Sequence, residues 1–213
     1  AMILHVLHCH NIDCDYMVGA QLEGFDTMVR LTEAAPMAIF EGDEYLSSPI
    51  DRRPKFHLYQ PHIALLSGIA WDHINVFPTF ENYVEQFEIF ADQLPKEGTL
   101  VYCEEDQELN RVVEGSSTGA EKIPYGVPGH QIKDGKTYLV DNTGEVITEL
   151  SVFGDHNLMN LNGARIICNQ IGVSDTDFYI AIGSFAGASN RMEKIGESEE
   201  VVVFKDFAHS PSK

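Results

Sequence analysis

The sequence predicts an α/β fold in which a mostly parallel sheet is flanked by helices and carries a small antiparallel insert. Two apolar runs, 36–40 and 62–70, are continuous rather than alternating, which is typical of strands covered on both faces of a parallel sheet. Segments with strand and helix patterns alternate along the chain. From about residue 120 to 150, short runs of mixed polarity separated by turn signals indicate the antiparallel insert.

The first half of the chain supplies two predicted helices and most of the predicted strands. Residues 1–10 read as a helix, and aromatic and aliphatic residues recur at helical spacing over 79–94, which predicts an amphipathic helix. The predicted strands are short apolar runs that end at glycine or at polar residues: 16–18, 36–40, 62–70 and 98–103.

The second half begins with the insert. Asp134-Gly135 and Asn142-Thr143-Gly144 are turn signals, so its strands form a hairpin or meander. Helical periodicity returns over 156–170 and 175–183, and 200–205 is the last predicted strand. No repeat or low-complexity linker interrupts this pattern. We therefore expect one domain with a small insert.

Composition limits the partners of the chain. Its 213 residues include 33 acidic and 14 basic ones, for a formal net charge of −19, which disfavours binding to nucleic acid. An anionic nucleotide would need Mg²⁺, backbone amides or a basic side chain to offset that charge. The four cysteines are sparse, and no secretory signal or run of 18 apolar residues is present. We expect a reduced, cytoplasmic protein without membrane insertion.

Two predicted strands end in groups that could bind a metal. Acidic residues at 41, 43 and 44 follow one strand, and Asp72-His73 follows another. Ligands of open α/β sheets collect at the carboxyl ends of strands, where a carboxylate can hold Mg²⁺ against nucleotide phosphates. Acidic residues after a strand are more often a solvated loop. Spacing alone leaves the two interpretations evenly balanced.

Two other groups have a functional and a structural interpretation. His5 and Cys9 lie one helical turn apart and could hold zinc, but no second ligand pair with zinc-site spacing follows, so a helix with mixed buried and exposed histidines is preferred. Asp155 is a plausible N-cap, and Asn157 and Asn160 lie one turn apart near a helix N-terminus. Their amides could read an adenine edge, although propensity favours capping and surface roles.

Six motifs, in this order, resemble those of the Mur ligase family across nearly the whole chain. They are Glu41-Gly42-Asp43-Glu44-Tyr45, Arg53-Pro54-Lys55-Phe56, Asp72-His73, His156-Asn157-x-x-Asn160, Arg191-Met192-Glu193 and Asp206-Phe207-Ala208-His209-x-Pro211. One such motif is weak evidence, whereas six in order with compatible spacings are strong. Within the family, the 41–59 stretch and the last motif look most like the murein peptide ligases.

The resemblance implies a domain organisation. The chain would be the central ATP-binding domain, with a P-loop NTPase-like fold over residues 1–205, and 206–213 would begin the hinge to a C-terminal domain. Both ends look cut, because the family's phosphate loop should precede residue 1, and a UDP-binding domain should lie before it. We expect this piece alone to be inactive, because the phosphate loop supplies the amides and lysine that hold ATP phosphates.

The resemblance also implies residue roles, with ATP and Mg²⁺ as cofactors. Glu41 and His73 match Mg²⁺ ligands that take part in catalysis. The segment of His156, Asn157 and Asn160 matches the adenine side of the nucleotide site. Arg191 and Asp206 match positions that contact the nucleotide as the domains close.

The implied reaction is ATP-driven amide-bond formation through an acyl phosphate, in peptidoglycan recycling. The implied substrates are UDP-N-acetylmuramate and the peptide L-alanyl-γ-D-glutamyl-meso-diaminopimelate; L-alanine as the amine is the alternative. A module that has lost catalysis also stays open, because five positions depart from the family pattern: Gly68, Asn75, Asn190, Lys205 and Ser210.

Overall fold

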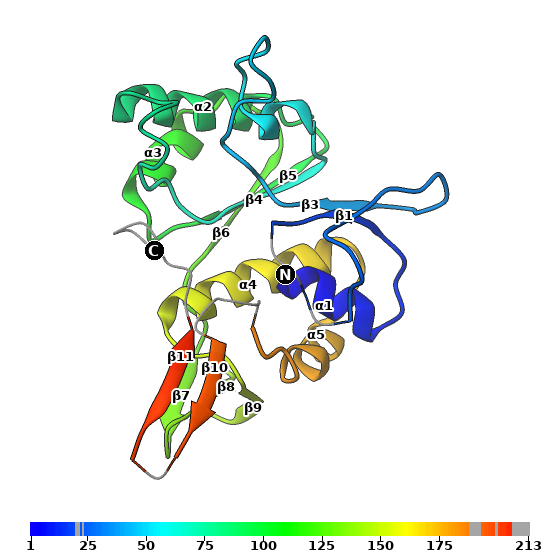
Figure 1. Ribbon diagram of the computed structural model, residues 1–213, viewed down its shortest axis with the longest axis vertical. Coiled ribbons are helices and arrows are strands. Elements are labelled where there is room, and N and C mark those ends of the chain that lie inside the picture. Colours follow the sequence, from blue (N-terminus) through cyan, green and yellow to red (C-terminus); the bar gives the residue numbers. More distant parts are fainter. Residues whose placement is uncertain (20–21, 23, 188–192, 199, 206–213) are drawn as a thin grey trace. The chain divides into compact units, whose positions relative to one another are not determined.

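The computed structural model describes residues 1–19, 22, 24–187, 193–198 and 200–205 (Figure 1). These residues form two compact units that interleave along the sequence. Unit 1 contains Ala1–Glu41, Gly129–Gly154 and the described part of Ser174–Lys213, and unit 2 contains Gly42–Pro128 and Asp155–Val173. The chain therefore passes from one unit to the other four times.

Unit 2 is built on a parallel sheet of three strands in the order β4-β5-β6: β4 (Ile63–Leu66), β5 (Thr99–Cys103) and β6 (Glu121–Tyr125). The central strand β5 buries Leu100 and Val101 completely, as expected for a strand with neighbours on both sides and helices on both faces. Its apolar run has no alternation because neither face meets water.

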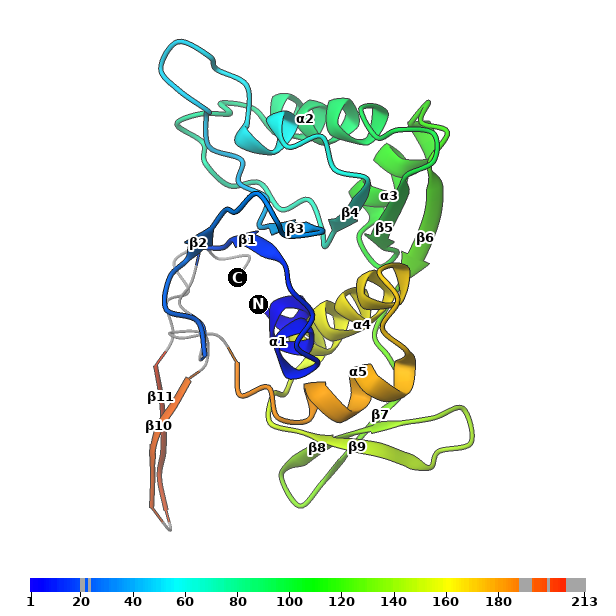
Figure 2. The ribbon, with the colours of Figure 1, turned by 90° about the vertical axis from the view of Figure 1, so that its right-hand side faces the viewer.

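Helices cover both faces of this sheet (Figure 2). Helix α4 (Asp155–Gln170) packs against all three strands, while α3 (Gln107–Gly115) packs on β5 and against α2 (Phe80–Asp92). Each of α2 and α3 begins at a side-chain cap: Thr79 accepts a hydrogen bond from the Asn82 amide, and Asp106 accepts one from the Leu109 amide. A short 3-10 helix, η1 (Lys55–Leu58), precedes β4.

Unit 1 combines two helices with three small sheets. Helix α1 (Met2–Cys9) packs against α5 (Asp175–Ile182). In the first sheet, β1 (Asp15–Met17) pairs antiparallel with β2 (Val29–Arg30) and parallel with β3 (Ala38–Phe40). The strands β10 (Glu193–Glu197) and β11 (Val202–Lys205) form an antiparallel hairpin.

The third sheet of unit 1 is an antiparallel meander of β7 (His130–Lys133), β8 (Lys136–Val140) and β9 (Val146–Leu150). Asp134 and Gly135 join β7 to β8 with φ values of 51° and 75°, the left-handed conformations of a two-residue hairpin turn. At the next turn, the Asp141 carboxylate accepts hydrogen bonds from the amides of Thr143 and Glu145. The hydrogen bonds from Thr143 lower the pKa of Asp141.

The predicted α/β class, with helices around a parallel sheet and an antiparallel insert, is confirmed. One part of the insert was predicted wrongly: β6 lies inside the 120–150 range but pairs parallel with β5. Mixed polarity suggested an antiparallel strand there, whereas β6 is an edge strand of the parallel sheet and keeps exposed positions for that reason. The predicted strand 62–70 shortens to β4, because its hydrogen-bonded pairing with β5 ends at Leu66.

Candidate functional site

Glu41 directly follows β3, as the sequence predicted. Its backbone amide donates to the carbonyl of Met17 at 2.8 Å, which continues the pairing of β3 with β1. Its carboxylate Oε2 accepts the amide of Gly19 at 2.9 Å. A side chain at Gly19 would place its Cβ 3.3 Å from Oε1 of Glu41, so glycine leaves room for this contact. The exposed carboxylate of Glu41 is thereby held at the carboxyl end of a parallel strand.

The other acidic residues of this motif begin a hairpin-like loop in unit 2. The Lys55 amide donates to the carbonyl of Tyr45 at 3.0 Å, and Leu46 pairs with Pro54. Lys55 Nζ lies 2.8 Å from Asp43 Oδ2, and this hydrogen bond raises the pKa of Lys55. The base of the loop is therefore closed by both backbone and side-chain contacts.

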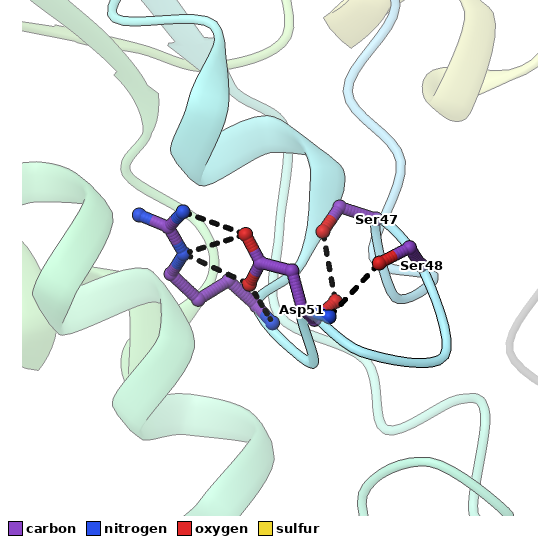
Figure 3. A network of polar contacts seen from close by, with 4 residues as sticks. Ser47, Ser48 and Asp51 are labelled. Atoms are coloured by element: carbon purple, nitrogen blue, oxygen red, sulfur yellow. Dashed lines mark hydrogen bonds and ion pairs between the residues drawn. The ribbon is translucent and has the colours of Figure 1, made fainter.

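The tip of this loop is fixed by the network in Figure 3. Ser47 Oγ donates to the carbonyl of Asp51 at 2.8 Å, and the Asp51 amide donates to Ser48 Oγ at 2.9 Å. The Arg53 guanidinium binds the Asp51 carboxylate through Nε and through a second nitrogen at 2.6 Å. These hydrogen bonds lower the pKa of Asp51 to about 2. All of these contacts join residues of the loop itself.

His73 lies in the loop that follows β4, at the carboxyl end of that strand. Its φ of 55° is uncommon for a residue with a side chain, and such strain tends to cluster at functional sites. The Asp72 carboxylate stabilises this backbone by accepting the His73 amide at 2.7 Å. The carbonyl of His73 accepts the amides of Val76 and Phe77 at 2.7 and 2.9 Å. The loop is thus organised around His73.

The imidazole of His73 is enclosed by residues of both loops. Its side chain is only 13% exposed, and the ring lies 4.2 Å from the ring of Tyr45. Nε2 is 3.7 Å from Oε2 of Glu44, and Nδ1 is 3.9 Å from Oδ1 of Asp72. A carboxylate therefore faces each ring nitrogen, and an aromatic ring covers one face.

Helix α2 contributes a further residue, Tyr83, to this cluster. Tyr83 donates its hydroxyl hydrogen to Oε1 of Glu44 at 3.2 Å. Burial, together with the nearby Glu44 carboxylate, raises the pKa of Tyr83 well above its ordinary value, so the phenol stays a neutral donor. Glu44 thus contacts both Tyr83 of α2 and His73 of the loop after β4.

The N-terminal end of α4 carries the predicted adenine-side residues. His156 Nε2 lies 3.3 Å from Asn160 Nδ2, one turn further along the helix. Asn157 is partly exposed, and Asp155 is the first residue of the helix. Arg191 and Asp206 lie outside the described residues. The structure thus gives α4 a polar first turn, and adenine binding there stays a prediction.

Comparison with known proteins identifies the family. Residues 22–168 match the model of the Mur ligase middle domain, more than half of the chain. The chain belongs to the Mur ligase family. It is 30% identical, over 92% of its length, to the UDP-N-acetylmuramate–L-alanyl-γ-D-glutamyl-meso-2,6-diaminoheptandioate ligase of Escherichia coli strain K12. It is 27% identical, over its full length, to the UDP-N-acetylmuramate–L-alanine ligase of Arthrobacter sp. strain FB24.

Solved structures of Mur ligases and folylpolyglutamate synthase share the fold. The UDP-N-acetylmuramate:L-alanyl-γ-D-glutamyl-meso-diaminopimelate ligase from Neisseria meningitides superposes with a TM-score of 0.76 at 23% identity, over 87% of this chain and 61% of that one. MurF from Acinetobacter baumannii gives 0.76 at 15% identity, over 99% and 48%. The Mur ligase chain spans 44% and 46% of the lengths of the two curated relatives.

The Mur ligase family uses ATP and Mg²⁺, and the available donors fit that ion. Among the described residues, no three histidine, cysteine or acidic side chains gather as a metal site. Mg²⁺ does not need such a group, because it is usually held by one or two carboxylates with water and substrate phosphates. Glu41 in unit 1, and Glu44 and Asp72 beside His73 in unit 2, supply oxygen donors of that kind.

The positions at which this Mur ligase departs from the family pattern have different surroundings. Gly68 has a φ of 151°, and a Cβ there would lie 3.0 Å from Oδ2 of Asp106, so glycine is required by this backbone. Asn75 and Lys205 are exposed. Asn190 and Ser210 lie outside the described residues.

Two further sequence interpretations can be placed. His5 Nε2 lies 2.9 Å from Ser184 Oγ and 3.1 Å from the carbonyl of Ala181, so its ring contacts the end of α5, and Cys9 Sγ is 3.6 Å away. Among the described helices, none has the length and apolarity needed to cross a membrane.

The role of Tyr83 was not predicted from the sequence. Its position fits the apolar stripe of α2, and helical spacing assigns it to the core. Periodicity describes the ring and says nothing of where the hydroxyl points. The one signal in the sequence was a tyrosine, with its polar hydroxyl, at a buried position of α2. Only the packing of α2 shows that this hydroxyl reaches the acidic loop.

Proposed function

We propose that the protein containing this chain is an ATP-dependent amide ligase that joins UDP-N-acetylmuramate to L-alanyl-γ-D-glutamyl-meso-diaminopimelate. The observation that carries the proposal is the cluster of Glu44, Asp72 and His73 at the carboxyl end of β4. Ligands of open α/β sheets bind at this edge. The likeness of the 41–59 stretch to murein peptide ligases, and of the chain to the E. coli ligase, supports the choice of substrates.

The proposed reaction has two steps. A carboxylate oxygen of the muramyl group attacks the γ-phosphorus of ATP, and the bond from this phosphorus to the β,γ-bridging oxygen breaks. ADP departs, and the muramyl carboxylate has become an acyl phosphate. The amine nitrogen of the peptide then attacks the acyl carbon, and a tetrahedral intermediate expels phosphate while the amine loses a proton. ATP, acid and amine thereby give ADP, phosphate and amide. Both steps depend on alignment of the reactants.

The residues of the chain would bind and orient these reactants. Glu41 would hold one Mg²⁺ and His73 a second. Mg²⁺, when bound, offsets the negative charge of the phosphoryl oxygens. His156, Asn157 and Asn160 would lie on the adenine side. In a chain with a net charge of −19, such offsetting is needed before an anionic nucleotide can bind. Arg191 and Asp206 are proposed to contact the nucleotide.

L-alanine is the second candidate for the amine. The full-length match to the Arthrobacter L-alanine ligase, at 27% identity, favours it almost as strongly as the first. Both candidates share the acid, the nucleotide and the acyl phosphate, so only the amine distinguishes them.

The test is release of ADP by the protein in its full natural length, with UDP-N-acetylmuramate and either the tripeptide or L-alanine. We expect release that depends on the tripeptide and disappears when the acid, the amine or Mg²⁺ is omitted. Release with L-alanine alone would move the protein to the second candidate. Absence of release with both amines would refute both and leave the non-catalytic module.

A further inference from the structure

Tyr83 makes a contact that its place in the core does not explain. Its side chain packs against the rings of Phe77 and Phe87, with centroids 5.4 and 5.1 Å away, and only 2% of the residue is exposed. A phenylalanine would fill the same space. The hydroxyl instead donates to Oε1 of Glu44, a residue at the start of the loop before η1.

The second carboxylate oxygen of Glu44 faces His73. Oε2 lies 3.7 Å from Nε2 of His73, about 0.5 Å beyond an ordinary N–H···O hydrogen bond. The side chain of Glu44 is one-third exposed, so without the phenol it could rotate into water. Tyr83 therefore limits the rotamers of Glu44 and keeps the second oxygen of Glu44 beside Nε2 of His73.

We propose that Tyr83 and Glu44 are positioning residues for His73. Tyr83 holds Glu44, and Glu44 keeps the ring proton of neutral His73 on Nε2, which leaves Nδ1 with the free lone pair on the side of Asp72. Histidines that bind metals usually donate the other ring N–H to a carboxylate, which fixes both tautomer and orientation. The role toward Mg²⁺ rests on the proposed function, whereas the arrangement of the three side chains does not.

The chain supplies a matched control. Tyr125, at the end of β6 in the same unit, is 3% exposed, and among the described residues it is the one whose buried side-chain polar atom has no hydrogen-bond partner. Tyr83→Phe and Tyr125→Phe each remove one buried hydroxyl. Only the first removes a contact to Glu44. Any effect of losing a phenol in general will appear in both variants.

The first readout is the tautomer of His73 in the metal-free protein. Proteins labelled with ¹⁵N-histidine are compared at pH 8, and the His73 signals are assigned by their loss in His73→Gln. We expect Nε2–H in the wild type and in Tyr125→Phe, and a mixture in Tyr83→Phe. In Glu44→Gln the amide can still accept from Tyr83 while its NH₂ faces Nε2, so the proton should move to Nδ1.

The second readout is the Mg²⁺ concentration that half-activates ADP release. We expect it to rise roughly tenfold in Tyr83→Phe, with the KM for ATP within about twofold and Tyr125→Phe unchanged. An unchanged His73 tautomer in Tyr83→Phe and Glu44→Gln would overturn the proposal. An altered tautomer with unchanged Mg²⁺ activation would overturn the positioning role toward the metal. A wild type without any ADP release would refute the proposed function, while the tautomer would still decide the arrangement.

Discussion

Asp106 shows how one side chain can join two elements of unit 2. One carboxylate oxygen accepts the Leu109 amide at 2.9 Å and caps α3, and the other accepts the Ile69 amide at 2.7 Å just after β4. The carboxylate occupies the space beside Gly68 that a Cβ would need. Because the loop with His73 begins here, Gly68 and Asp106 fix its starting point.

Replacing Gly68 with alanine should therefore destabilise the protein. The new Cβ would lie 3.0 Å from Asp106 Oδ2, and φ of 151° is unfavourable for alanine. We expect a loss of about 1–3 kcal/mol in the free energy of unfolding, measured by urea denaturation. Gly42→Ala, at a position with no atom within 4 Å of the new Cβ, is the control and should change stability little. Equal effects of the two substitutions would contradict this account of Gly68.

The Asp51–Arg53 ion pair makes a prediction about pH. The arginine hydrogen bonds lower the pKa of Asp51 from 3.8 to about 2. A carboxyl with a lowered pKa stabilises the folded state above pH 3.8 and loses that contribution as the pH falls toward 2. We expect the Asp51 carboxyl carbon to titrate near pH 2 in an NMR experiment, and Arg53→Gln to move the midpoint toward 3.8. Arg52→Gln is the control, and a shift as large as that of Arg53→Gln would refute the assignment to Arg53.

At the scale of elements, the close packing of α4 on the parallel sheet depends on Gly163. An added Cβ would lie 2.9 Å from Cζ of Tyr125 on β6 and 3.0 Å from Cδ1 of Leu65 on β4. Tyr125 is buried, with only 3% of the residue exposed. A glycine in the middle of a long helix is thus explained by the approach of two strands rather than by flexibility.

Gly163→Ala tests this packing, because helix propensity and sterics oppose each other. Alanine gains up to about 1 kcal/mol of helix propensity, whereas overpacking costs about 1–3 kcal/mol. We expect the second effect to win and the midpoint of urea unfolding to fall. Gly115→Ala at the end of α3, with no atom within 4 Å of its added Cβ, should raise the midpoint or leave it unchanged. A rise for Gly163→Ala would show that α4 can move off the sheet.

The elements also show what the sequence could predict. The apolar run of β5 and the stripe of α2 were predicted, because a buried strand and an amphipathic helix each follow from local periodicity. Helix α3 was not predicted: it has nine residues, and only Leu109, Val112 and Val113 are buried. Strand β6 was wrongly assigned to the insert. Its pairing partner is set by tertiary contacts, which the composition of the strand does not reveal.

The same limit applies to the candidate site. Glu41 and His73 could be proposed from motif order, because each lies in one of the six motifs that resemble the family. Glu41 directly follows β3, whereas His73 lies in the loop after β4. The contacts of Glu44 with Tyr83 and His73 join residues 39 and 29 positions apart, and no local pattern encodes them. Side-chain orientation across such separations requires the fold.

At the scale of the whole molecule, the net charge of −19 should weaken the folded state at low ionic strength. Like charges on a compact surface repel, and salt screens that repulsion over about 10 Å at 0.1 M. We expect the melting temperature to rise between about 10 and 150 mM NaCl. Choline chloride at equal ionic strength is the control for specific ion effects. A melting temperature that falls with both salts would show that ion pairs such as Arg111–Glu108 outweigh the general repulsion.

The interleaving of the two units has a consequence for synthesis on the ribosome. Helix α1 buries Leu4, Val6 and Leu7 completely, and it packs on α5, which ends at Ile182. At roughly 5–20 residues per second, the apolar face of α1 waits about 10–35 s for that partner to be made. During this interval a nascent chain carries an uncovered apolar helix, a natural target for chaperones that bind emerging polypeptides.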